Sequence, residues 1–69
     1  MRKQYVKAVL RSPYGTELEG WLDPAGHELK AWSKVQLTGT TGTYTITGLG
    51  APQDLPKGAS YFTVTRKVS

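Results

Sequence analysis

Short runs of alternating apolar and polar residues, most of them ended by a cluster of proline or glycine, extend through nearly the whole chain. This period of two is typical of a strand with one face toward a core, whereas a surface helix repeats its apolar residues at intervals of three and four. No stretch of the sequence keeps the helical period for three turns. The chain is therefore predicted to be all-β.

Five segments carry this strand pattern. They are residues 6–11, 17–22, 29–37, 38–47 (where a turn leads into the strand) and 61–68. In the longest segment, the inward face is predicted to hold Leu29, Ala31, Ser33, Val35 and Leu37, and the outward face Lys30, Trp32, Lys34 and Gln36. Residues 48–58 contain two prolines and are predicted to form a loop, with one short 3₁₀ turn at 51–55.

Two turns predict how the middle strands pair. Hairpins closed at residues 23–26 and at residues 39–42 both place inward residues opposite inward residues. The facing pairs are then Leu18 with Ala31 and Glu19 with Lys30 in the first hairpin, and Leu37 with Tyr44 and Val35 with Ile46 in the second. Strands two to four are therefore predicted to form an antiparallel meander.

The turn at residues 12–15 gives the opposite result. Closure at Ser12 and Gly15 would pair Leu10 with Glu17, which puts an apolar residue on a charged face. Because a slip of one residue moves every side chain to the other face of the sheet, we expect a β-bulge or an irregular loop near residues 13–16.

Five short strands without a helix predict one domain, residues 1–69, built as a small five-stranded antiparallel meander. The architecture that it resembles best is an SH3-like barrel. An OB-fold would normally place a helix between the third and fourth strands, and residues 38–42 leave no room for one. The alternative is an open, strongly twisted meander that a second subunit completes.

The chain has 69 residues and no cysteine, so neither disulfides nor thiolate metal sites are available to stabilise it. A chain of this length buries only about 60% of its unfolded surface, and self-association is a common way to stabilise so thin a core. No apolar run approaches the roughly 20 residues of a membrane span. A cytoplasmic protein without a membrane partner is expected.

Charge is distributed unevenly along the sequence. Nine Lys and Arg residues against five Asp and Glu residues give a net charge of +4. Residues 1–16 contain Arg2, Lys3, Lys7 and Arg11 and no carboxylate, whereas residues 17–28 contain four carboxylates and no Lys or Arg. If the two terminal strands are neighbours, their basic residues form one patch that attracts an anionic partner, most commonly nucleic acid.

Residues for catalysis are scarce. His27 is the only histidine, and Asp23 and Glu28 are the only acidic residues close to it in sequence, which is too little for most zinc sites. Residues 48–50 read Gly-Leu-Gly without the further glycine of a dinucleotide-binding loop. We therefore expect no enzymatic activity, no metal and no cofactor.

The outward aromatic residues give the strongest functional signal. Trp32 is flanked two residues away on each side by Lys30 and Lys34, so a flat ring lies between two ammonium groups. Bases stack on such rings while cations contact phosphates, and stacking contributes about 1–3 kcal/mol per base. The outward faces of the other strands are predicted to add Trp21, Tyr5, Lys7, Arg11, Tyr61 and Lys67.

Interfaces between proteins are also enriched in Trp, Tyr and Arg. The sequence therefore favours a non-enzymatic binding module that acts through this aromatic and basic face. Its first candidate partner is another protein or a second copy of the chain, as in an accessory protein with which a phage or plasmid inhibits a host protein. The alternative partner is DNA or RNA, bound by stacking on Trp32 and by phosphate contacts to Lys30 and Lys34.

Overall fold

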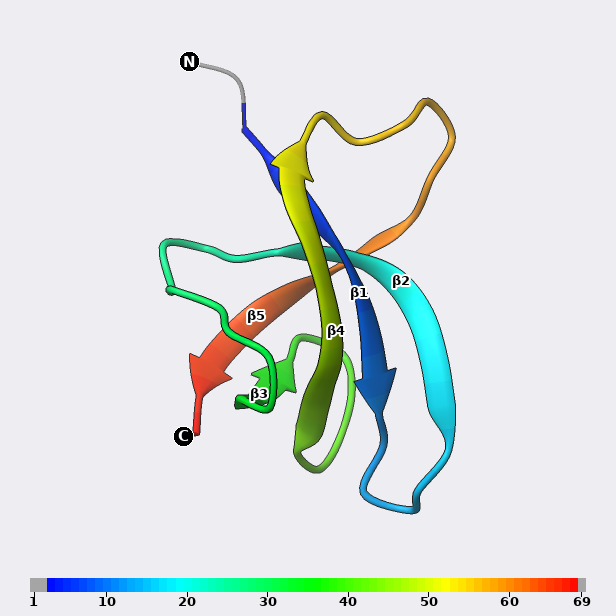
Figure 1. Ribbon diagram of the computed structural model, residues 1–69, viewed down its shortest axis with the longest axis vertical. Coiled ribbons are helices and arrows are strands. Elements are labelled where there is room, and N and C mark those ends of the chain that lie inside the picture. Colours follow the sequence, from blue (N-terminus) through cyan, green and yellow to red (C-terminus); the bar gives the residue numbers. More distant parts are fainter. Residues whose placement is uncertain (1–2, 69) are drawn as a thin grey trace.

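A computed structural model describes residues 3–68 as a closed barrel of five strands, with no helix in that range (Figure 1). The strands are β1 (Tyr5–Arg11), β2 (Glu17–Asp23), β3 (Lys34–Leu37), β4 (Tyr44–Gln53) and β5 (Tyr61–Lys67). The all-β prediction is confirmed, and the closed five-stranded barrel is consistent with a small SH3-like barrel.

The order of the strands around the barrel differs from the predicted meander. The order is β1-β2-β5-β3-β4, with β4 closing on β1. β5 lies between β2 and β3, antiparallel to β3 but parallel to β2. The meander of strands two to four is therefore wrong, as is the expectation of a wholly antiparallel sheet.

The connection between β2 and β3 explains this difference. Residues 24–33 form two successive turns rather than one tight hairpin: His27 N–H donates to the Pro24 carbonyl at 2.9 Å, and Ser33 N–H donates to the Lys30 carbonyl at 3.1 Å. Both central residues of the first turn have positive φ, Ala25 at 51° and Gly26 at 84°. The chain leaves the edge of β2, and residues 29–33, predicted to be strand, belong to this connection.

The β1–β2 hairpin confirms the predicted irregular loop. Leu10 pairs with Leu18 and Arg11 with Glu17, so apolar faces apolar. Gly15 N–H donates to the Ser12 carbonyl at 3.0 Å, and Ser12 N–H donates to the Thr16 carbonyl at 2.8 Å. Gly15 has a φ of 87°, the arrangement of a type I turn followed by a left-handed residue. The extra residue restores the register.

The β3–β4 hairpin is confirmed, with its register shifted by two residues from the prediction. Val35 pairs with Tyr44 instead of Ile46, and a shift of two leaves each side chain on its predicted face. β4 also continues to Gln53 through the stretch predicted to be a loop, so the 3₁₀ turn at 51–55 is wrong.

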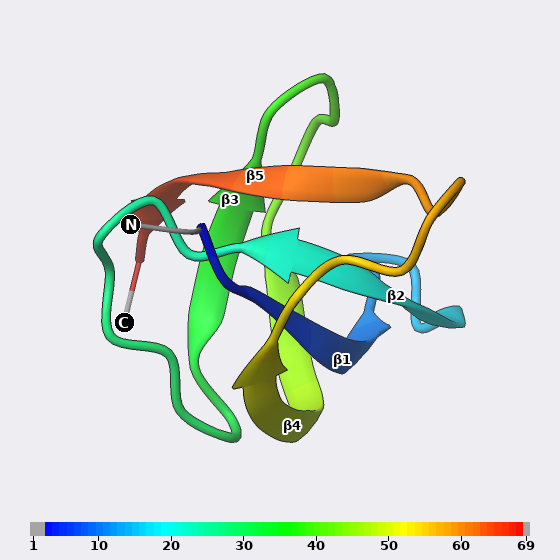
Figure 2. The same ribbon diagram turned by 90° about the horizontal axis from the view of Figure 1, so that it is seen from above.

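Two glycines allow this long β4 to curl closely around β1 (Figure 2). A Cβ at Gly48 would lie 3.4 Å from Val9, and one at Gly50 would lie 3.3 Å from the Lys7 carbonyl oxygen. The β1–β4 ladder shifts register twice in this region. Strand pairing with β1 therefore overrides the turn preference of a sequence rich in glycine and proline.

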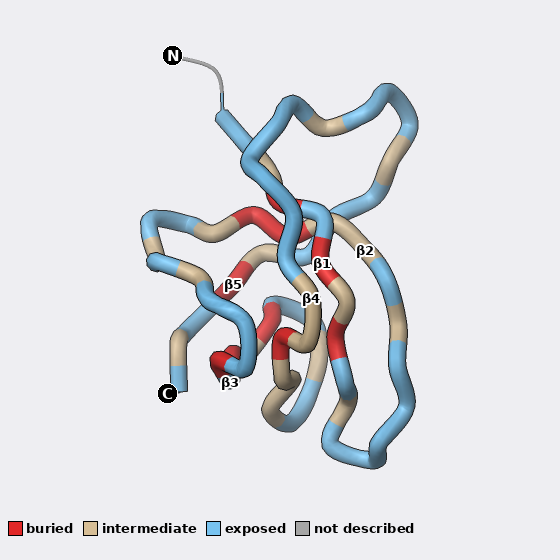
Figure 3. The backbone as a smooth tube through the Cα atoms, viewed as in Figure 1, coloured by how far each residue is buried: buried red, intermediate tan, exposed pale blue. Residues whose placement is uncertain are grey.

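The core is small and comes from the inward positions of all five strands (Figure 3). Its fully buried side chains are Leu10, Leu22, Val35, Ile46 and Val64, joined by Val6, Ala8 and Leu37. Alternation predicted these faces correctly. It was wrong at Ala31, which is exposed in the β2–β3 connection. In residues 61–68 alternation puts Phe62 and Val68 on the side of Val64, yet they are 36% and 42% exposed near the ends of β5.

Gly42 and Gly39 provide matched positions for testing how the β1–β2 loop packs on the β3–β4 connection. Both have left-handed backbones, with φ of +83° and +82°, so alanine at either position costs about 1–2 kcal/mol of strain. A Cβ at Gly42 would also lie 2.6 Å from Pro13 Cγ, whereas a Cβ at Gly39 meets nothing within 4 Å. Gly42→Ala is therefore expected to lower the free energy of unfolding more than Gly39→Ala does, by about 1–3 kcal/mol. Urea denaturation measures both values.

The Pro13→Ala background isolates the contact with Pro13. In that background the two glycine substitutions should destabilise the protein equally, because the clashing ring carbon is gone. Equal losses in the original background would contradict the packing of Pro13 against Gly42.

Candidate functional site

The residues predicted to share one outward face occupy two separate regions. Tyr5, Trp21 and Tyr61, which we call the aromatic cluster, lie where β1, β2 and β5 meet. Lys34 begins β3, which pairs with the far end of β5, and Trp32 lies in the turn before β3. Tyr61 and Lys67 are the two ends of β5, and six steps along a strand span about 20 Å.

The aromatic cluster is held together by strand pairing. Trp21 lies directly across from Lys7 on one side and from Tyr61 on the other. The Tyr5 and Tyr61 rings contact each other with centroids 4.8 Å apart and planes tilted by 57°. Trp21 is half-buried rather than fully outward, and burial, followed by the neighbouring Tyr61, raises the pKa of Tyr5.

Ion pairs between β2 and the N-terminal part of the chain run beside this cluster. Lys3 Nζ lies 2.7 Å from Asp23 Oδ2, Lys7 Nζ lies 3.4 Å from Glu19 Oε1, and Arg11 Nη2 lies 3.6 Å from Glu17 Oε2. The basic and acidic blocks of the sequence therefore neutralise each other across the β1–β2 hairpin. Lys7 and Arg11, predicted to contact a partner, are each paired with a glutamate.

Asp23 is the buried member of these pairs. Its side chain is 4% exposed, and Oδ1 accepts a hydrogen bond from Ala25 N–H at 3.0 Å. The hydrogen bond from Lys3, and then that from Ala25, holds the pKa of the Asp23 carboxyl below its usual value although burial acts against this. The same bond raises the pKa of Lys3.

The expected merging of basic residues from the two terminal strands does not occur, because β2 lies between β1 and β5. Lys67 is half-buried at the end of β5 and pairs with Val35, so it lies next to β3 rather than beside Lys7. Arg2 lies outside the described residues.

The second region is the outer surface of the β3–β5 pair. Gln36 lies directly across from Arg66, so these side chains share a face, and alternation puts Lys34 on the same face. Val68 N–H donates to the Lys34 carbonyl at 2.7 Å, which brings the C-terminal end of β5 alongside. With the adjoining Trp32 we call this surface the basic face: Trp32, Lys34, Gln36, Arg66 and Val68.

Trp32 is 67% exposed, as predicted, but for a different reason. It lies in the turn before β3, with a φ of 68°, rather than on the outward side of a strand. The backbone N–H of Trp32 donates to the Ile46 carbonyl at 2.6 Å, and this bond anchors the backbone while the indole faces solvent. Lys30 is also exposed, with Nζ 3.6 Å from Glu28 Oε1.

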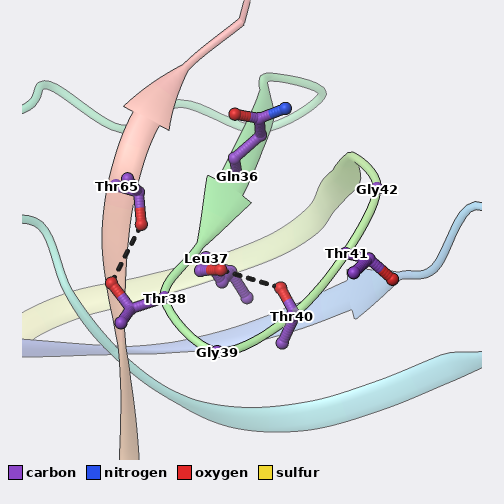
Figure 4. A pocket seen from close by; sticks show the side chains of 8 residues that line it. All are labelled: Gln36, Leu37, Thr38, Gly39, Thr40, Thr41, Gly42 and Thr65. Atoms are coloured by element: carbon purple, nitrogen blue, oxygen red, sulfur yellow. Dashed lines mark hydrogen bonds between the residues drawn. The ribbon is translucent and has the colours of Figure 1, made fainter.

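A shallow pocket of about 550 Å³ lies beside the basic face, at the β3–β4 turn (Figure 4). It is lined by Gln36, Leu37, Thr38, Gly39, Thr40, Thr41, Gly42 and Thr65. The Thr38 and Thr65 hydroxyls are 2.9 Å apart, and the Thr40 hydroxyl donates to the Leu37 carbonyl at 2.9 Å. The lining offers uncharged hydrogen-bonding groups and has no acid or base for catalysis.

Sequence reasoning did not select Gln36, Arg66 or Val68 as site residues. Arg66 and Gln36 lie at outward positions next to each other only because β5 pairs with β3, and no local pattern predicts that pairing. His27 is half-buried in the β2–β3 connection, and residues 3–68 bring together no group of three side chains able to hold a metal ion.

Comparisons with protein-family models, with curated proteins and with solved structures find no match to this chain. Within residues 3–68 there is also no helix with the length and hydropathy needed to cross a bilayer. The functional argument therefore depends on the geometry and charges described above.

Lys3→Met tests the buried ion pair. At neutral pH we expect a lower melting temperature, because Asp23 stays buried without its cation. The lowered pKa of Asp23 means that the stabilisation is complete above the ordinary value of about 3.9 and is lost as pH falls through the folded value. The raised pKa of Lys3 means that stabilisation on the alkaline side is lost only as pH rises through that higher value.

The measurement is the difference in melting temperature between the original protein and Lys3→Met across the pH range. It should be constant near neutrality and approach zero in strong acid. Lys57→Met, which changes an exposed lysine in the β4–β5 loop, is the control and should show no such dependence. A difference that persists undiminished in strong acid would mean that Lys3 acts through packing and not through charge.

Proposed function

We propose that the protein is a non-enzymatic binding module that binds single-stranded nucleic acid on its basic face. The observation that carries this proposal is the segregation of charge. β3 and β5 contain Lys34, Arg66 and Lys67 and no carboxylate, whereas three carboxylates lie on β2 and are paired with Lys3, Lys7 and Arg11. The excess positive charge is thus concentrated on two neighbouring strands that contain no carboxylate, and Glu28, in the connection before β3, is paired with Lys30.

The indole of Trp32 supports a single-stranded partner. A ring that is 67% exposed at the margin of a basic surface offers a base the stacking platform that a duplex, with its bases already stacked, cannot use. Lys34 follows two residues later, and the polar side chains of Gln36 and Arg66 continue the same surface. Cations then track the backbone while the ring holds a base, the combination found in strand-binding barrels.

Salt dependence tests the proposal with a labelled oligothymidine. If Lys34 and Arg66, the two cations of the basic face, each neutralise one phosphate, the logarithm of the association constant should fall with the logarithm of salt concentration with a slope of about −1.4. Fluorescence anisotropy across a salt series measures this slope. Lys34→Ala and Arg66→Ala should each make this slope shallower by about 0.7, the contribution of one phosphate contact to a single strand. Absence of binding at low salt would contradict the proposal.

Trp32→Ala tests the stacking platform. Because the side chain is mostly exposed and alanine keeps a similar backbone, the melting temperature should change little, while binding should weaken by about 1–3 kcal/mol. Tyr14→Ala is the matched control: Tyr14 is 92% exposed on the β1–β2 loop and should leave binding unchanged. Unfolding of Trp32→Ala would mean that the indole is a core residue, and equal binding would remove Trp32 from the site.

The aromatic cluster favours a second candidate, a protein partner. The Tyr5 and Tyr61 rings contact each other, and Trp21 lies across from Tyr61 beside neutralising ion pairs, as in interface centres that are aromatic with a polar rim. An accessory protein of a phage or plasmid that blocks a host protein would use such a surface. Partner capture lost in Tyr61→Ala but retained in Trp32→Ala would favour this candidate.

Either role fits a cytoplasmic location, since a chain without cysteine needs no oxidising compartment to fold.

A further inference from the structure

The outer edge of β4 has no strand beside it over most of its length. β3 pairs with β4 only at Thr45 and Tyr44, and the last backbone bonds on this side join Ile46 to Trp32 and Ser33. From Thr47 to Gln53, β4 pairs with β1 on its other side and with no further strand among residues 3–68. The backbone groups on this side of the segment therefore have no strand partner in that range, and two register shifts interrupt its ladder with β1 on the other side.

The corresponding edge of β2 carries charged side chains, and that of β4 does not. Residues Glu17–Gly20 of β2 lie beyond its short pairing with β5, and two glutamates occupy them. Charged side chains on an exposed edge oppose pairing with another strand. The β4 segment reads Thr-Gly-Leu-Gly-Ala-Pro-Gln and has no charge at all. Its two glycines also leave little side-chain bulk over the backbone.

We propose that a second copy of this chain pairs with β4 along this edge, antiparallel and across a two-fold axis near Leu49 and Gly50. A two-fold interface uses the same patch on both subunits, and an uncharged segment can face itself without repulsion. The free segment ends at Ile46 on one side, because the backbone groups of Ile46 already bond to Trp32 and Ser33. It ends at Pro52 on the other side, because proline has no N–H to donate.

This dimer would join two barrels into one continuous sheet through β4 and leave β3 and β5 outside the interface. Both basic faces would remain open, so the inference goes beyond the proposed function and does not depend on it. The partner is recognised by main-chain hydrogen bonds, the mode by which an extended segment adds to a sheet edge.

Sedimentation equilibrium and amide hydrogen exchange, both without nucleic acid, test the proposal. From low micromolar to millimolar concentration the mass should rise from one chain toward two. Over the same range the amides that become protected should be those of residues 47–51. Leu49→Lys should raise the dissociation constant at least about tenfold, because like charges placed opposite each other across paired strands repel. Ala51→Lys, at a fully surface position of the same edge, should weaken the dimer in the same direction.

Phe62→Lys is the matched control, since Phe62 has the same 36% exposure as Leu49 but lies on β5. It should leave the dissociation constant unchanged, and circular dichroism confirms that each variant is folded. A mass of one chain at every concentration would overturn the proposal, as would a dimer that is insensitive to both edge variants. Protection of 47–51 that appears only on adding an unrelated extended peptide, with the mass of a single copy of this chain, would assign the edge to a foreign strand and also overturn it.

Discussion

The buried carboxylate of Asp23 determines where the chain leaves its second strand. Asp23, the last residue of β2, has three neighbours: Lys3 binds one carboxylate oxygen, Ala25 N–H binds the other, and Thr63 of β5 pairs with the Asp23 backbone. Because the bond to Ala25 starts the turn at residues 24–27, the chain turns away from β2 instead of folding back along it. β5 then pairs with the edge of β2 that β3 would otherwise occupy. The basic face exists only because β5 also pairs with β3.

The same interaction begins a division of the surface by charge. Ion pairs along the β1–β2 hairpin leave that side of the barrel nearly neutral, and the short β3 and the end of β5 retain their cations. Neighbouring blocks of opposite sign in the sequence are brought together by one hairpin, whereas the remaining cations come from segments separated by about half the chain. The net charge of +4 therefore understates how basic one side of this small molecule is.

Alternation predicted which side of a strand faces inward, but it could not predict which strands are neighbours. It placed Leu10, Leu22, Val35, Ile46 and Val64 in the core, because a half-buried strand shows its period locally. It failed to show that residues 29–33 are turns and that Ala31 is exposed, although Leu29 packs against the core and Ser33 is buried as predicted. The sequence also did not predict that β4 continues to Gln53. Glycines usually mark a loop, whereas Gly48 and Gly50 allow close contact between β4 and β1. Trp32 was correctly expected at the surface, although a left-handed backbone and not strand parity puts it there.

The insertion of β5 between β2 and β3 has a consequence for the order in which the barrel assembles. The β1–β2 and β3–β4 hairpins join residues close in sequence, whereas β2 and β5 are brought together across some forty residues. Contacts of such long sequence separation form slowly, because the loop must close before they contribute any energy. The two hairpins can already pair through β1 and β4, but the barrel stays open between β2 and β3 until β5 is inserted there. Until β5 docks, the facing edges of β2 and β3 are unpaired and the apolar core is open on that side, so the barrel without β5 is the state most exposed to misassembly.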